Sequence, residues 1–204
     1  MSEVNFNELA KAIKHLDVYM LIGNGSKNQF GNMRQINNIL KKILETIPPK
    51  SAFLYFGDSA NKKKPDVGLL FELIKKNRPD IKICMIQIKE AKSWGVPKFV
   101  DYVYWHRDYT KKCKWGGVIK GVPCSNTKKW VSLNKRIKQG ISRVFILGGG
   151  EITLDEFSLI KKNKIPYEYY PVKRKYKGDG KTRIKAQDSP SVKVGITYGK
   201  INSH

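Results

Sequence analysis

Short apolar runs alternate with segments of helical periodicity along most of the chain. The runs predict strands near residues 18–22, 52–56, 81–88, 99–105, 143–147 and 167–172. The periodic segments predict helices over residues 5–16, 33–47, 128–140 and 153–162, and one more that starts after Asp66. Strands alternating with helices are typical of parallel βαβ units. The pattern predicts an α/β fold over residues 1–172: a Rossmann-like, open, mainly parallel sheet with helices on both faces.

The C-terminal part has a different pattern. Residues 173–181 contain several cations and a Gly-Asp-Gly turn but no apolar periodicity, so they are expected to be flexible or ordered by a partner. Residues 191–198 alternate well enough to predict an edge strand or an arm onto a neighbouring subunit. Residues 173–204 are therefore interpreted as a basic extension of the Rossmann-like domain.

Two strand-to-helix connections are rich in glycine. Three consecutive glycines follow the strand at 143–147, and Gly23-Asn-Gly-Ser26 follows the strand at 18–22. Glycine lets a backbone approach a ligand closely, and a following helix presents free N–H groups to an anion. The strand at 52–56 ends in Gly57-Asp58-Ser59, and in a parallel sheet all three turns lie at one edge. The expected phosphate-binding residues are Gly23, Gly25, Ser26, Gly57, Asp58, Ser59, Gly148, Gly149 and Gly150.

These turns also have a simpler interpretation. A triple glycine can form a tight strand-to-helix turn that binds nothing, and Ser26 can belong to a polar loop tip. The spacing matches neither the dinucleotide fingerprint nor the Walker loop.

The chain is strongly basic, with 40 Lys and Arg against 17 Asp and Glu and a formal charge of +23. The tail from Pro171 carries +7, so residues 1–170 still carry +16. Such a field attracts polyanions, which predicts a nucleic acid or another phosphate-rich partner.

Cations and aromatic residues are interleaved between residues 104 and 138, where Asp108 is the only acid. This combination suits single-stranded RNA or DNA, because bases stack on aromatic rings while cations follow the backbone. The alternative is that the tryptophans pack in the core and the lysines form a solvated face. The candidate nucleic-acid-binding residues, including two in the tail, are Trp105, Arg107, Lys111, Lys112, Lys114, Trp115, Lys128, Lys129, Trp130, Arg174 and Lys175.

Three cysteines without close spacing suit reduced thiols. The N-terminus lacks the layout of a signal peptide, and no apolar stretch is long enough to cross a bilayer. We therefore expect a cytoplasmic or otherwise intracellular protein that is neither secreted nor embedded in a membrane. His106, Cys113 and Cys124 match no standard zinc spacing, so no metal site is expected.

The residues from Gly148 to Glu156 resemble the Pro-Gly-Gly-x-Gly-Thr-x-x-Glu signature of the LOG family, which belongs to the SLOG superfamily of Rossmann-like nucleotide-binding proteins. Gly148 replaces the proline and Ile152 the later glycine. The resemblance implies a phosphate-binding role for Thr153 and, in an enzyme, catalytic roles for Glu156 and Arg136. In this sequence Arg136 lies nearer to the glycines than the corresponding arginine does in the enzymes.

Three functions follow as hypotheses. The first is a Rossmann-like protein that binds a nucleotide or phosphate without catalysis and engages nucleic acid, as a homo-oligomer or inside a larger assembly. The second is an enzyme similar to nucleoside monophosphate phosphoribohydrolases. The third is a basic structural protein of a viral or organellar nucleoprotein assembly.

Overall fold

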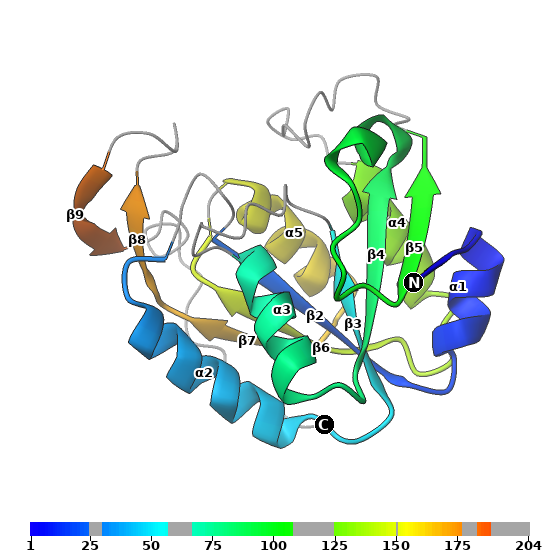
Figure 1. The fold of residues 1–204 in the computed structure, drawn as a ribbon, viewed down its shortest axis with the longest axis horizontal. Helices are drawn as coiled ribbons and strands as arrows, with labels where there is room; N and C mark the ends of the chain where they lie inside the picture. Colours follow the sequence, from blue (N-terminus) through cyan, green and yellow to red (C-terminus); the bar gives the residue numbers. More distant parts are fainter. Residues whose placement is uncertain (25–29, 57–66, 108–124, 150, 177–182, 189–204) are drawn as a thin grey trace.

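Seven strands form one parallel sheet, in the order β1-β5-β4-β3-β2-β6-β7 (Figure 1). The computed structural model describes residues 1–24, 30–56, 67–107, 125–149, 151–176 and 183–188. The strands are β1 (Ser2–Glu3), β2 (Asp17–Gly23), β3 (Ser51–Tyr55), β4 (Lys82–Ile88), β5 (Tyr102–His106), β6 (Ile141–Leu147) and β7 (Tyr167–Tyr170). The α/β, Rossmann-like fold predicted from the sequence is confirmed.

Helices cover both faces of this sheet. The front layer, as Figure 1 is drawn, consists of α2 (Met33–Thr46), α3 (Val67–Asn77) and the 3₁₀ helix η1 (Lys89–Trp94). The back layer consists of α1 (Phe6–Ile13), α4 (Ser125–Asn134) and α5 (Glu151–Lys162).

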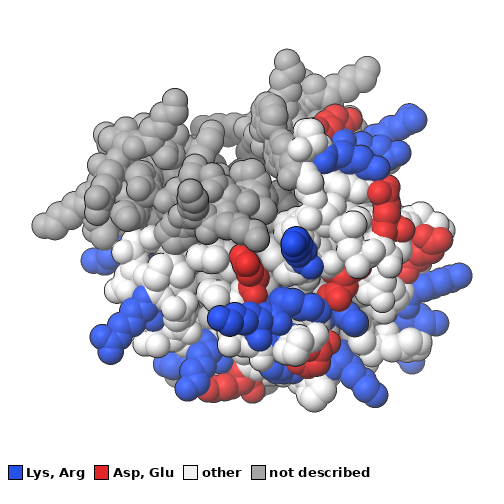
Figure 2. Space-filling model, viewed as in Figure 1, with Lys and Arg blue, Asp and Glu red and all other residues white. Residues whose placement is uncertain are grey.

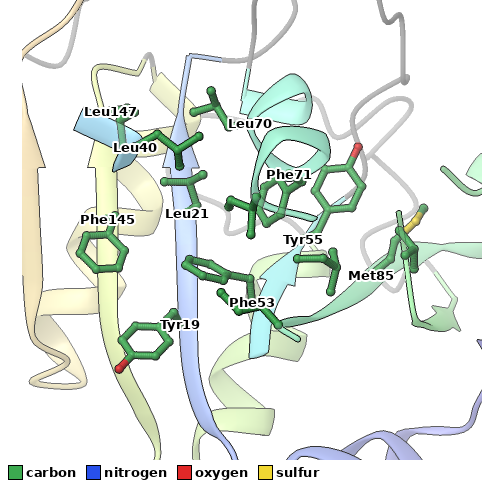
Figure 3. Close-up of a cluster of buried hydrophobic side chains, with 14 of the residues drawn as sticks. Tyr19, Leu21, Leu40, Phe53, Tyr55, Leu70, Phe71, Met85, Phe145 and Leu147 are labelled. Atoms are coloured by element: carbon green, nitrogen blue, oxygen red, sulfur yellow. The ribbon is translucent and has the colours of Figure 1, made fainter. Parts of the chain in front are cut away.

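Each strand supplies alternate side chains to two separate cores. In β2, Tyr19 and Leu21 pack into the front core, whereas Val18 and Met20 pack into the back core. Figure 3 shows the front core, where residues of β2, β3 and β6 meet Phe71 of α3. Because both faces are buried, the strands read as nearly continuous apolar runs rather than as alternating ones.

Local capping determines where α1 begins. The Asn5 side chain accepts hydrogen bonds from the backbone N–H groups of Asn7 (2.9 Å) and Glu8 (3.0 Å). The Glu8 carboxylate in turn accepts one from the Asn5 N–H (2.8 Å). This capping box satisfies backbone donors that have no partner within the helix.

Two details differ from the sequence prediction. Helix α4 begins and ends earlier than the predicted 128–140. Residues 173–181 were expected to be flexible or ordered by a partner; the structure adds a strand that was not predicted there, since β8 (Lys173–Tyr176) pairs with β9 (Arg183–Asp188) as a separate antiparallel ladder. Backbone hydrogen bonds hold this ladder together. Because the sequence has no apolar periodicity here, its pattern does not predict the ladder. Residues 191–198 lie outside the described part of the chain.

Candidate functional site

The strand order reverses direction between β2 and β6. From β2 the chain builds β3, β4 and β5 on one side, then returns to place β6 and β7 on the other. In open α/β sheets a ligand binds beyond the carboxyl ends of the strands at such a reversal. Gly23 ends β2 directly beside Leu147 of β6, and Gly148 follows. The sequence placed these two glycine turns at one edge of the sheet, and here they meet.

Asn24, which was not among the residues predicted from the sequence, connects the two turns. Its side chain is fully buried, and its Oδ1 accepts a hydrogen bond from the N–H of Gly149 (2.7 Å). Its backbone N–H donates to the Leu147 carbonyl (3.0 Å), and its own carbonyl accepts from the N–H of Val67 at the start of α3 (2.9 Å). The signal was an asparagine between two glycines at a strand end, a position that favours local hydrogen bonding to the backbone.

Packing alone requires glycine at two positions of these turns. At Gly23 a Cβ atom would lie 2.1 Å from the Leu147 carbonyl oxygen, and at Gly149 it would lie 2.3 Å from Thr153 Oγ1. Both residues also have positive φ, +148° and +114°. A side chain is therefore excluded whether or not a ligand is bound.

Two backbone donors of this turn, those of Gly148 and Gly149, are already in use. The Gly148 N–H donates to the Tyr170 carbonyl (3.0 Å), and the Gly149 N–H donates to Asn24. A phosphate at this edge would therefore bind to the N–H groups that open α5, where the helix dipole favours an anion.

Thr153 and Glu156 lie one turn apart on the inner face of α5. Both are buried, with 3% and 8% of the residue exposed. Thr153 Oγ1 faces the Gly23 carbonyl at 3.5 Å, so its hydroxyl contacts the end of β2. The structure thus brings Thr153 and Glu156 behind the glycine turn.

Arg136 lies elsewhere. It follows α4, near the amino end of β6, and its guanidinium stacks on Phe6 at 4.9 Å and donates to Asn7 Oδ1. Residue Ile141 starts β6 at that end, and the glycine turn follows the other end, about 20 Å away for a seven-residue strand. The structure does not bring Arg136 to Glu156.

Several candidates lie outside the described residues. Among the phosphate-binding candidates these are Gly25, Ser26, Gly57, Asp58, Ser59 and Gly150. Among the nucleic-acid-binding candidates they are Lys111, Lys112, Lys114 and Trp115. Arg174 and Lys175 lie in β8, whose backbone alone is described at these positions.

Two tryptophans selected for base stacking are core residues. Trp105 is 7% exposed in the front core, and Trp130 is 0% exposed in the back core. A ring buried in this way has no free face for a base, so the stacking role does not fit these two residues; packing, the alternative considered from the sequence, describes them. Arg107 and Lys128 are exposed, and Lys129 is half-buried with its Nζ 5.6 Å from the centroid of the Phe6 ring.

A buried polar chain at the same edge of the sheet was also missed. Gln87 Nε2 donates to the Phe56 carbonyl (2.7 Å), and Gln87 Oε1 accepts from Asn126 Nδ2 (2.8 Å). Asn126 Oδ1 then contacts His106 Nε2 (2.7 Å). Gln87 was detectable as the one polar residue between Ile83 and Ile88, because a buried amide must find partners.

An oxygen atom faces each ring nitrogen of His106. The Phe56 carbonyl fixes the orientation of the Gln87 amide and, through it, that of Asn126, so His106 Nε2 faces an oxygen. His106 Nδ1 faces the Arg107 carbonyl oxygen at 2.9 Å. His106, buried at 2% exposure, thus links β5 to the first turn of α4.

No protein-family model matches the chain, and no curated protein matches it. Among the described residues, no three His, Cys, Asp or Glu side chains are grouped so that they could hold a metal ion. No helix in the described part is long and apolar enough to cross a membrane. Function must therefore be inferred from the geometry and the charge of the chain itself.

Proposed function

We propose that this protein binds a phosphate-bearing ligand, such as a nucleotide, at the edge where β2 meets β6, and that it engages nucleic acid without catalysing a reaction. The reversal of strand order carries the first part of the proposal. It brings Gly23, Asn24 and Gly149 together at the only such reversal among the described strands. The resemblance to the SLOG superfamily, which rests on the nine residues from Gly148 to Glu156, supports the same site.

The charge supports the second part. A formal charge of +23 on 204 residues attracts polyanions and accelerates their association. With Trp105 and Trp130 buried, the described residues favour contact with the phosphate backbone over base stacking.

Ligand binding is tested best at the start of α5. Gly149 is unsuitable, because any side chain there meets Thr153 and disturbs folding. Glu151 is the first residue of α5, and its negative charge disfavours a phosphate at the same helix end. With AMP as the probe in calorimetry, Glu151→Gln should tighten binding about two- to five-fold, the equivalent of 0.3–1 kcal/mol.

Glu45→Gln serves as the matched control. Glu45 is exposed near the end of α2 in the front layer, and its substitution changes the net charge equally. If AMP and inorganic phosphate show no saturable binding, or if both variants change the affinity alike, the site is not at α5.

One observation favours an enzyme as the second candidate: Glu156 is a buried carboxylate behind the glycine turn. In a hydrolase of nucleoside monophosphates its charge would be essential, whereas a binding protein would retain AMP affinity after Glu156→Gln. Release of free adenine from AMP by the wild type, lost in Glu156→Gln, would establish the enzyme. Our proposal predicts no release above background, since Arg136 lies at the other end of β6.

A further inference from the structure

The segment 125–140, comprising α4 and the turn after it, carries positive charge without any acidic residue. It contains five cations. These are Lys128, Lys129, Lys135, Arg136 and Lys138.

Core packing fixes the side of α4 that faces outward. Trp130 and Leu133 are fully buried in the back core, and Ile137 after the helix is 3% exposed. Lys128 and Lys135 are exposed. Because the apolar residues are held against the sheet, Lys128 of the helix and Lys135 of the turn after it are held on the exposed side of this segment.

Ion pairing elsewhere does not reach this face. The ion pairs among the described residues are Lys75–Asp101, Arg78–Asp80, Lys82–Asp101, Lys92–Glu3 and Arg143–Glu168. Within that part of the chain, Lys128, Lys135 and Lys138 have no acidic partner. Their charge is therefore available to an anionic group of another molecule.

Arg136 is also held in place. Its guanidinium lies over Phe6 and donates to Asn7, both at the start of α1. A cation held by a ring and an amide keeps its charge while losing side-chain freedom. Binding an anion there therefore costs less conformational entropy.

We propose that this outer face, made of Lys128, Lys135, Arg136 and Lys138, binds the phosphate backbone of nucleic acid. The inference rests on the proposed function and assigns it a surface. The ten residues of α4 span about 15 Å, and Lys135, Arg136 and Lys138 lie in the turn beyond them, so the segment is long enough for about four phosphates at 3.4 Å per nucleotide along one strand. Since the tryptophan of this helix is buried, recognition is electrostatic and independent of base sequence.

The experiment compares two triple variants of equal charge. The first replaces Lys128, Lys135 and Lys138 by Gln. The second replaces three exposed lysines of the front layer, Lys41, Lys42 and Lys76, by Gln. Each lowers the formal charge from +23 to +20, so only the position of the lost charge differs.

Affinity for a 20-nucleotide single-stranded RNA and for a 20-base-pair DNA duplex is measured between about 50 and 200 mM salt, the range over which phosphate contacts show their effect. The α4 variant should bind on the order of a hundred-fold more weakly near 0.1 M salt, with a log–log slope shallower by about 2 for RNA and about 2.7 for duplex DNA. The front-layer variant should keep most of the wild-type slope. The two probes show whether single strands or duplexes are preferred.

The outcomes are separable. If the wild type binds neither probe at low salt, the proposed nucleic-acid function fails. If the wild type binds and both variants lose affinity equally, or the α4 variant loses none, only the assignment to α4 fails. Poly-glutamate that competes as well as RNA would show that the face serves an acidic protein instead. Circular dichroism melting of both variants confirms that each remains folded.

Discussion

Cations have different surroundings in the front helical layer and in the α4 segment of the back layer. In the front layer, acids lie among the lysines and arginines, as Figure 2 shows, and ion pairs join Lys75 to Asp101 and Arg78 to Asp80. In the back layer, the α4 segment 125–140 has five cations and no acid. Net charge therefore identifies a class of partner, whereas the local pairing of charges indicates where that partner can bind.

Asp101 shows how far the front layer neutralises itself. Its carboxylate accepts hydrogen bonds from Lys75 Nζ (2.9 Å) and from the Ile83 N–H (2.9 Å), and Lys82 lies 3.8 Å away. These cations help to position the start of β5. Among the described residues, the α4 cations make no comparable ion pairs, although Lys129 and Arg136 contact the Phe6 ring.

Removing one large core side chain from each layer should give the largest effects. Trp130→Ala and Phe71→Ala should each lower the free energy of unfolding by about 3–5 kcal/mol, since both side chains are fully buried. Only Trp130→Ala should also lower the RNA affinity of the molecules that remain folded, because it weakens the packing of α4 against the sheet. Urea denaturation and binding assays measure the two effects. Equal loss of affinity in both variants would contradict the difference between the layers.

Asn126 should matter next. Asn126→Ala removes the hydrogen bonds that Asn126 makes with Gln87 Oε1 and with His106 Nε2 at the first turn of α4, which should cost about 1–3 kcal/mol. Thermal melting measures this, with Ser132→Ala as the control. Ser132 is exposed and its hydroxyl bonds only the Lys128 carbonyl (3.0 Å), so its loss should stay within about 0.5 kcal/mol. A similar cost for both would mean that the buried chain does not anchor α4.

The sequence was sufficient for the sheet and most helices because their signals are local. The apolar runs at 18–22 and 143–147 became β2 and β6 almost unchanged. The strand β1 was missed, since two residues carry no period and its position depends on backbone bonds such as that from the Ser2 N–H to the Asp101 carbonyl.

The candidate site was only partly predictable. Glycine spacing located both turns, but it could not show that Asn24 occupies the Gly149 N–H or that Thr153 fills the space beside it. The first of these contacts joins residues 125 positions apart in the sequence. Likewise, tryptophans among lysines suggested base stacking. The same sequence pattern fits a tryptophan that faces the core and one that faces a ligand, and only the packing of the helix against the sheet distinguishes them.

Acid should affect the front layer through Asp80. The hydrogen bond from Arg78, with a smaller opposing effect of burial, lowers the pKa of this carboxyl below its ordinary value. A lowered pKa in the folded state means that the stabilisation is present above the unfolded pKa, about 3.9, and is lost as pH falls through the folded pKa. Because the pair is partly exposed, the loss should stay below about 1 kcal/mol.

Denaturation between pH 6 and pH 2, in the wild type and in Asp80→Asn, measures this contribution. The variant should lack that part of the acid dependence, so the difference in stability between the two proteins should shrink as pH falls. A difference that stays constant over this range would show that the ion pair with Arg78 contributes nothing.

The smallest change in stability should come from giving α4 the kind of pairing found in the front layer. Ser132→Glu places a carboxylate four residues after Lys128 on the exposed side of α4 and three before Lys135, which is exposed in the turn after the helix. Each such pair should stabilise the helix by about 0.2–0.5 kcal/mol. The control is Asn38→Glu on the exposed side of α2, which meets Lys41 and Lys42 at the same kind of spacing.

Both variants lower the net charge by one and should melt slightly higher than the wild type. Only Ser132→Glu should weaken RNA binding several-fold, because its carboxylate occupies cations that would otherwise contact phosphates. Affinity at 0.1 M salt measures this, and melting confirms that each new pair forms. If Asn38→Glu weakens binding as much, the chain presents its charge evenly to RNA, and pairing in the front layer does not distinguish the two layers.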